Sequence, residues 1–232
     1  MSTPPASTPA PLVVRGPGQG LRPREHLWPA GHSIVRAHPS EFGSTEFDRR
    51  EDANARFSPV RPAGLVQGVL YGASGHNGAA SETVFHTVPA PEPASPERRP
   101  RQVALGPYKS WVWSVLVCRR DLRLVDLDDA GLTDLGTTRD ELVLSGRLDY
   151  PVTRQWSLAL WHAAPWADGL LWSSRQDPGS AALMLFEKRD DRRGGVERRE
   201  LSADGPPDPL FYPEGLERLY QLATRLDITI VV

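Results

Sequence analysis

The chain has 232 residues, of which 39% are hydrophobic and 24% charged, with a formal net charge of −2. This length suits one large domain or two small ones, and the balanced charge argues against a broad nucleic-acid-binding surface. A single cysteine, Cys118, excludes an internal disulfide and is typical of a reducing compartment. No secretory signal and no apolar run of membrane-spanning length is evident, so we expect a cytoplasmic protein without membrane contact.

The N-terminal residues 1–27 are rich in Pro, Ser, Thr and Gly, which predicts a disordered or extended arm. We expect one folded domain over residues 28–232, interrupted by a proline-rich surface loop at 89–101. The first strand is predicted at 33–38 and carries Arg36.

A second arginine, Arg56, stands beside Phe57 and is followed by a Ser-Pro turn. Two guanidinium groups such as Arg36 and Arg56 can grip a diphosphate through bidentate hydrogen bonds. Their ordinary alternative role is in surface salt bridges.

The next segment predicts a strand at 68–73, a glycine-rich loop at 74–78 and a helix at 79–87 with Asn77 as its N-cap. Tyr71 falls in this strand, and Glu82 falls in the first half of the predicted helix. An acid there has an ordinary explanation, because helix N-termini favour negative charge.

The remaining elements follow from hydrophobic periodicity and turn signals. We predict a strand at 111–118 near the centre of the sheet, a strand at 122–127, a helix or turn at 128–135, helices from Thr138 and over 153–163, a strand ending near Ser174, a hairpin of 181–188 with 196–201, a helix from Pro213 and a strand at 226–232. Because strands and helices do not alternate regularly, the fold class is α+β, with mixed or antiparallel sheets and short flanking helices.

Several familiar sites are excluded. The glycines at 72, 75 and 78 lack the spacing of a dinucleotide-binding loop. The six histidines have no zinc-ligand spacing, and Cys118 has no partner cysteine, so we expect no metal.

Five segments in order nevertheless resemble the RES-domain family, which is named for its arginine, glutamate and serine. They are Ile34-Val35-Arg36-Ala37-His38, Ala55-Arg56-Phe57-Ser58-Pro59, Val69-Leu70-Tyr71-Gly72-Ala73, Ala80-Ser81-Glu82-Thr83-Val84-Phe85 and Asp168-Gly169-Leu170-Leu171-Trp172-Ser173-Ser174-Arg175. The resemblance covers roughly residues 30–190.

The resemblance implies a compact domain related to ADP-ribosyltransferase toxins. Characterised members degrade NAD⁺; some are phosphorylases, and at least one kind ADP-ribosylates a protein. It therefore implies an NAD⁺ phosphorylase or glycohydrolase, the toxin of a type II toxin–antitoxin module. Its partner would be an Xre-like helix-turn-helix antitoxin. NAD⁺ would be the substrate and inorganic phosphate a co-substrate, with no tightly bound cofactor and no direct nucleic-acid contact. A mono-ADP-ribosyltransferase and a non-catalytic nucleotide-binding domain stay open as alternatives, as does a homo-oligomer.

The family roles pass to individual residues of this chain. Those implied as catalytic are Glu82, Arg36 and Tyr71, and those implied to bind NAD⁺ or phosphate are Arg56, Ser174 and Arg175. Because Ser173 adjoins Ser174, either can be the site serine. The chemistry suits these residue types, since a carboxylate can stabilise the oxocarbenium-like state in which the nicotinamide–ribose bond breaks.

Overall fold

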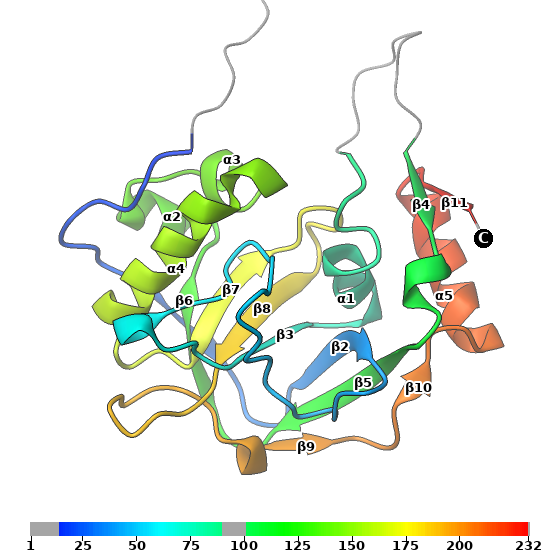
Figure 1. Ribbon diagram of the computed structural model, residues 1–232, viewed down its shortest axis with the longest axis horizontal. Coiled ribbons are helices and arrows are strands. Elements are labelled where there is room, and N and C mark those ends of the chain that lie inside the picture. The colour runs from blue at the N-terminus through cyan, green and yellow to red at the C-terminus, as the bar shows by residue number, and fades with distance from the viewer. Residues whose placement is uncertain (1–13, 90–100, 232) are drawn as a thin grey trace, which may run out of the picture.

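A computed structural model describes residues 14–89 and 101–231. A large curled sheet forms its centre, with α2, α3 and α4 beside one half and α1 and α5 beside the other (Figure 1). The helices are α1 His76–Glu82, α2 Asp129–Leu135, α3 Arg139–Leu142, α4 Tyr150–Ala163 and α5 Pro213–Arg225.

The large sheet has the strand order β1-β6-β7-β8-β3-β2-β5-β10, and β9 also pairs with β5. Its strands are β1 Glu25–Trp28, β2 Ser33–Pro39, β3 Val69–Ala73, β5 Trp111–Cys118, β6 Leu122–Asp126, β7 Gly169–Ser173, β8 Ala181–Phe186, β9 Leu201–Ala203 and β10 Asp208–Pro209. Only the β6–β7 pair is parallel within it, so the sheet is mixed and the predicted α+β class is confirmed. A separate parallel pair joins β4 Gln102–Ala104 to β11 Thr229–Val231.

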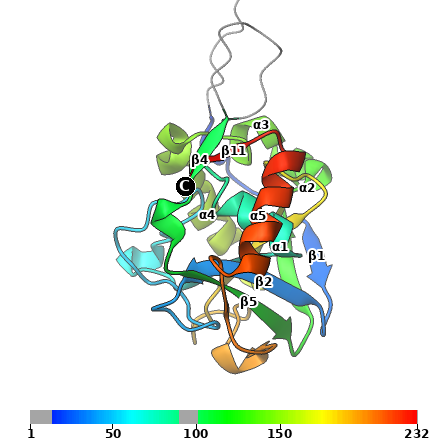
Figure 2. The same cartoon turned by 90° about the vertical axis from the view of Figure 1, so that its right-hand side faces the viewer.

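The alternation of apolar side chains along the strands divides the core into three clusters. One face of the sheet carries a cluster that includes Ile34, Leu70 and Leu116. The other face supports two clusters: one buries Trp156 of α4 among residues of β7 and β8, and the other buries Leu219 of α5 against β2 and β5. Figure 2 shows α5 running across the outside of this second half, next to α1.

The sheet divides between β2 and β3. These strands share one register pair, Val35 with Ala73, whereas β2 pairs with β5 along its whole length. At the junction a Cβ on Gly72 would lie 2.3 Å from Cγ2 of Ile34, so the close approach requires glycine. Beyond this point the two halves diverge.

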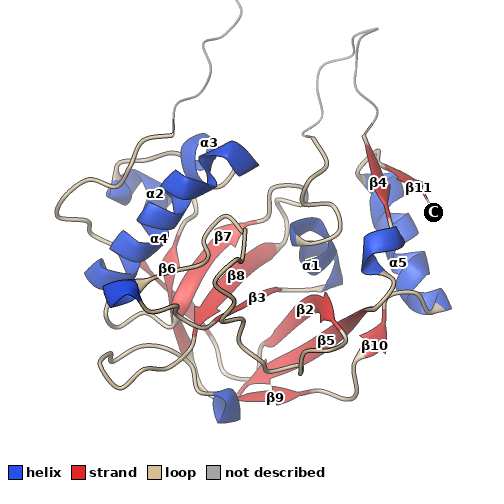
Figure 3. Cartoon of the chain, viewed as in Figure 1, coloured by secondary structure: helices blue, strands red, loops and turns tan. Residues whose placement is uncertain are grey.

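A long irregular segment, residues 40–68, crosses in front of this division (Figure 3). It contains one short 3₁₀ turn, Pro62–Gly64, and is fixed to β3 by the antiparallel bridge between Asp48 and Val69. Arg36 of β2 also holds it, because Nη1 donates to the carbonyl oxygens of Ser44 and Glu46, both at 2.9 Å.

The helix after β3 differs from the prediction. It spans His76–Glu82, with Gly75 rather than Asn77 at the N-cap. The helix begins early because Gly78 packs closely: a Cβ there would lie 2.8 Å from the Cβ atoms of Ala73 and Ser180. Glu82 is therefore the last helical residue, and the N-terminal explanation for an acid does not apply to it.

Two further predictions are wrong. The strand 111–118 exists as β5, but it lies toward one edge of the sheet, next to the short β9 and β10. The hairpin of 181–188 with 196–201 does not form, because β8 pairs with β3 and β7 and Leu201–Ala203 pairs with β5. Glu187, just after β8, makes only an isolated bridge with Val196.

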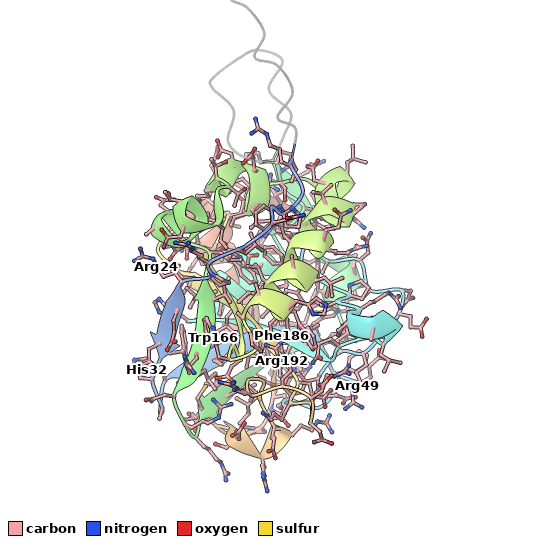
Figure 4. The ribbon with its side chains drawn as sticks, turned by 90° about the vertical axis from the view of Figure 1, so that its left-hand side faces the viewer. Arg24, His32, Arg49, Trp166, Phe186 and Arg192 are labelled. Atoms are coloured by element: carbon pink, nitrogen blue, oxygen red, sulfur yellow. The ribbon has the colours of Figure 1, made fainter. Side chains whose placement is uncertain are left out.

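The loop of that predicted hairpin is anchored rather than fully solvated. Arg192 is buried beside Phe186 (Figure 4), with its guanidinium 4.5 Å from the ring centroid of Trp161. It donates to the carbonyl oxygens of Trp161, Ala164 and Ala167 and so caps the carboxyl end of α4.

Part of the predicted arm 1–27 and of the loop 89–101 lies outside the described residues. Within the described part, residues 14–24 form no helix or strand, Val14 is buried, and the carbonyl oxygen of Arg15 accepts a 2.7 Å hydrogen bond from Nε1 of Trp156. No helix in the described ranges is long and apolar enough to cross a membrane.

Candidate active site

A cavity of about 330 Å³ opens where β2 and β3 diverge. Its walls come from β2, β3, the irregular segment and the end of α1, and Trp172 and Trp111 also line it. Four of the six predicted site residues line it directly: Arg36, Arg56, Tyr71 and Glu82.

The carboxylate of Glu82 receives several donors. Oε1 accepts from Oγ of Ser174 at 2.7 Å and from the backbone N–H of Arg175 at 3.1 Å. Oε2 accepts from the indole N–H of Trp172 at 3.4 Å and lies 3.6 Å from Nη1 of Arg56. Because the carboxyl end of a helix disfavours negative charge, these donors, rather than α1 itself, hold the anion in place.

Arg56 is 3% exposed, yet its Nε and Nη2 have no hydrogen-bond partner among the described residues. Buried guanidinium nitrogens are normally paired, because leaving them unpaired is costly. The ion pair with Glu82 engages only one end of the group. Arg56 is thus placed to bind an anionic ligand that enters the cavity.

The serine that adjoins the carboxylate is Ser174. It is fully buried and points to Glu82, while Ser173 uses its backbone N–H to bind the carboxylate of Asp128 at 2.8 Å. Arg139 of α3 donates to the carbonyl oxygen of Ser174 at 3.0 Å and fixes that turn from the other side.

Arg175 contributes its backbone N–H to Glu82, and its guanidinium group is half-buried. Burial, together with the positive charge of Arg56, lowers the pKa of the Arg175 side chain. The guanidinium adds positive charge near the carboxylate, although Arg175 does not line the cavity.

Tyr71 projects from β3 toward Trp172, with the two rings edge to face at 6.4 Å. Its hydroxyl donates to Oγ of Ser58 at 3.1 Å. Burial raises the pKa of the Tyr71 phenol, so the hydroxyl keeps its proton and serves as a hydrogen-bond donor.

Arg36 lines the cavity but is already engaged with the irregular segment through Nη1. Its Nε has no partner among the described residues, and burial lowers the pKa of the guanidinium to about 10. The same side chain therefore builds one wall of the cavity and keeps hydrogen-bonding capacity for a ligand.

His86 was not predicted, and it lines the cavity four residues beyond Glu82. Its Nε2 makes a short hydrogen bond with the hydroxyl of Tyr150. Burial and, next, the charge of Arg56 lower the pKa of His86 to about 4, so the ring is neutral at pH 7. The sequence offered one signal for His86, because in the predicted helix 79–87 a residue four positions after Glu82 falls on the same face.

Gln176 was missed as well, and it joins the two segments that build the site. Its Nε2 donates to the carbonyl oxygens of Val88 at 2.7 Å and Phe85 at 3.4 Å. Its Oε1 accepts from Nη2 of Arg101 at 3.0 Å. The bonds from Gln176 to Val88 and Phe85, together with the Ser174–Glu82 bond, fix the end of α1 and the residues after it against the turn after β7. In the described ranges, no group of three His, Cys, Asp or Glu side chains could hold a metal ion.

The family model of the RES domain matches residues 33–205 of this sequence. The chain belongs to the RES-domain family. No curated protein matches the sequence.

Among solved structures, the RES-domain chain described here matches one in the crystal structure of the MbcT–MbcA toxin–antitoxin complex of M. tuberculosis. The TM-score is 0.51 at 13% identity, and the match covers 81% of this chain and 90% of the other. At that identity the likeness is one of fold, and the fold is that of the RES domain.

Proposed function

We propose that this RES domain consumes NAD⁺ by cleaving the bond between nicotinamide and ribose. The observation that carries the proposal is the Glu82 carboxylate, held by Ser174, Trp172 and a backbone N–H at a cavity that also contains the unsatisfied guanidinium of Arg56. A fixed negative charge and a free anion-binding group are what a positively charged nicotinamide ribose linked to a diphosphate requires.

In this mechanism Glu82 stabilises the positive charge that develops on the ribose as nicotinamide leaves. Nicotinamide departs as a neutral ring and needs no proton, so one carboxylate suffices. Tyr71 is partly exposed and provides the aromatic surface beside the carboxylate where the nicotinamide ring packs, while the buried Trp172 supports it edge to face. Arg56, with Arg36, holds the diphosphate.

The acceptor of the ADP-ribosyl group is phosphate or water, since the family resemblance implies a phosphorylase or a glycohydrolase. Positive charge near Glu82 comes from Arg56 and Arg175, which favours an anionic acceptor. We therefore propose phosphorolysis as the main reaction and hydrolysis as the second candidate. ADP-ribosylation of a protein is the alternative outcome of the test below.

We further propose that the chain is a cytoplasmic toxin neutralised by an antitoxin protein of the Xre-like type. The fold likeness to a chain of a toxin–antitoxin complex supports a protein partner. Co-expression with the product of an adjacent helix-turn-helix gene should restore growth that expression of this chain alone arrests.

The direct test incubates the purified protein with NAD⁺, with and without phosphate, and measures free nicotinamide. We expect release, faster with phosphate, and a loss of about 10²–10³-fold in kcat for Glu82→Gln. Glu214→Gln on the exposed start of α5 is the matched control and should behave as wild type. Intact NAD⁺ under both conditions would refute the proposal. Label from NAD⁺ on a discrete protein in a lysate would identify ADP-ribosylation instead.

A further inference from the structure

The cavity has a second end that differs chemically from the Glu82 end. Trp172 of β7 and Trp111 of β5 both line the cavity, and these strands lie on opposite sides of the β2–β3 division, four positions apart in the sheet order. A ligand that fills the cavity from one end to the other would therefore contact two chemically different environments.

Two partly exposed aromatic side chains, Phe42 and Trp111, line this second end. Trp111 is supported edge to face by Tyr108, with ring centroids 5.1 Å apart, and the Tyr108 hydroxyl donates to the carbonyl oxygen of Thr83 at 3.2 Å. Phe42 lies under the guanidinium of Arg50, 5.6 Å from its ring centroid. Aromatic side chains held in place in this way lose little entropy when a planar ring stacks on them.

The two carboxylates at this end are already paired. Glu46 and Asp48 both line the cavity. Oε2 of Glu46 lies 3.8 Å from Nη2 of Arg198, and the guanidinium of Arg50 binds both oxygens of Asp48, at 3.0 and 2.8 Å. Charge at this end is thus largely balanced, and the two aromatic rings are the feature left to bind a ligand.

We propose that Phe42 and Trp111 bind the adenine ring of the dinucleotide. The inference rests on the proposed function for the identity of the ligand. Stacking on the two aromatic side chains supplies affinity for any purine ring.

The first experiment measures ADP binding by calorimetry and requires no turnover. Phe42→Ala and Trp111→Ala should each weaken ADP binding about tenfold, as loss of one stacking partner does. Tyr212→Ala, an exposed aromatic residue outside the cavity, is the matched control and should bind as wild type. Because Trp111 also packs on Tyr108, Phe42→Ala is the cleaner variant, and thermal unfolding verifies the fold of each.

The second experiment compares nicotinamide release from NAD⁺ and from nicotinamide mononucleotide. Phe42→Ala should raise KM for NAD⁺ about tenfold at near-constant kcat and leave the mononucleotide unaffected, because the latter has no adenine.

Unchanged ADP affinity in Phe42→Ala and Trp111→Ala would overturn the adenine assignment, as would an equal rise in KM for the mononucleotide. If no substrate releases nicotinamide but ADP binding weakens as expected, the proposed reaction fails and the purine-binding end stands.

Discussion

Ser174 donates a 2.7 Å hydrogen bond to Oε1 of Glu82 across 92 residues of sequence. The bond joins the turn after β7 to the last residue of α1, so two distant parts of the chain meet at one carboxylate. Neither oxygen of Glu82 depends on it alone, because Arg175, Trp172 and Arg56 approach the same group. The hydrogen bond from Ser174 therefore mainly orients the carboxylate and is not the sole contact that holds it in place.

Replacing Ser174 by alanine should lower kcat for nicotinamide release about 10–100-fold, because the carboxylate loses its shortest hydrogen bond and turns away from the ribose. Folding should survive with a loss of about 1 kcal/mol. Ser173→Ala is the matched control, since Ser173 contacts Asp128 through its backbone. Equal losses in the two variants would remove Ser174 from the site.

Arg56→Lys should raise KM for NAD⁺ about tenfold or more, because an ammonium group cannot reproduce the two-nitrogen fork that the cavity leaves unsatisfied. Steady-state kinetics gives the result directly. Arg61→Lys, on an exposed part of the same segment, is the comparison and should match wild type. A KM unchanged in Arg56→Lys would mean that the ligand phosphates lie elsewhere.

Gln176→Ala should destabilise the fold by about 2–3 kcal/mol, because buried partners at Val88, Phe85 and Arg101 each lose a hydrogen bond. It should also lower kcat, since Glu82 and Ser174 lose a second connection. Urea unfolding and turnover are measured on the same samples. Gln221→Ala, whose amide binds an exposed glutamate on α5, should change neither quantity.

Stability should fall on acidification because of His38. Burial, then the charge of Arg36, lowers the pKa of this histidine to about 4, while its Nδ1 donates to the carbonyl oxygen of Pro39 and its Nε2 pairs with Ser114. The unfolded chain binds the proton below about pH 6.5, so between pH 6.5 and 4 the unfolded state holds more protons and unfolding is favoured.

This histidine alone should remove about 2 kcal/mol of stability between pH 7.5 and 5, measured by urea unfolding. His86, whose pKa is also lowered to about 4, acts in the same direction. The variant His38→Asn should show a smaller pH dependence than wild type. His32→Asn, at an exposed position before β2, should retain the full dependence. A steeper slope in His38→Asn would contradict the neutral buried ring.

Much of the local structure could be predicted from the sequence, because hydrophobic periodicity and capping residues act over a few residues. The strand at Trp111–Cys118, the N-cap at Thr138 and the helix from Pro213 all follow from such signals. The order of strands could not, since the periodicity of β5 is the same at the centre of a sheet and near its edge. The start of α1 was misplaced because Gly78 appeared to be a loop residue, whereas it is a packing contact in the helix.

The residue types of the site followed from the family resemblance, but the contacts among them did not. Spacing along the chain does not encode which serine reaches Glu82, that Arg175 acts through its backbone, or that Gln176 joins the two segments. These depend on how β3 and β7 lie on either side of β8. Arg36 shows the same limit, because its engagement with Ser44 and Glu46 depends on the path of an irregular segment.

Because β2 and β3 share a single register pair, the proposed dinucleotide would act as a crosslink between the two halves of the sheet. One of its ends would rest on β3 and α1, and the other on β2 and β5, so occupancy would restrain the two halves of the sheet against separation. Substrate or a non-hydrolysable analogue should then slow amide hydrogen exchange at the β2–β3 junction far more than at β7–β8, which is fully paired.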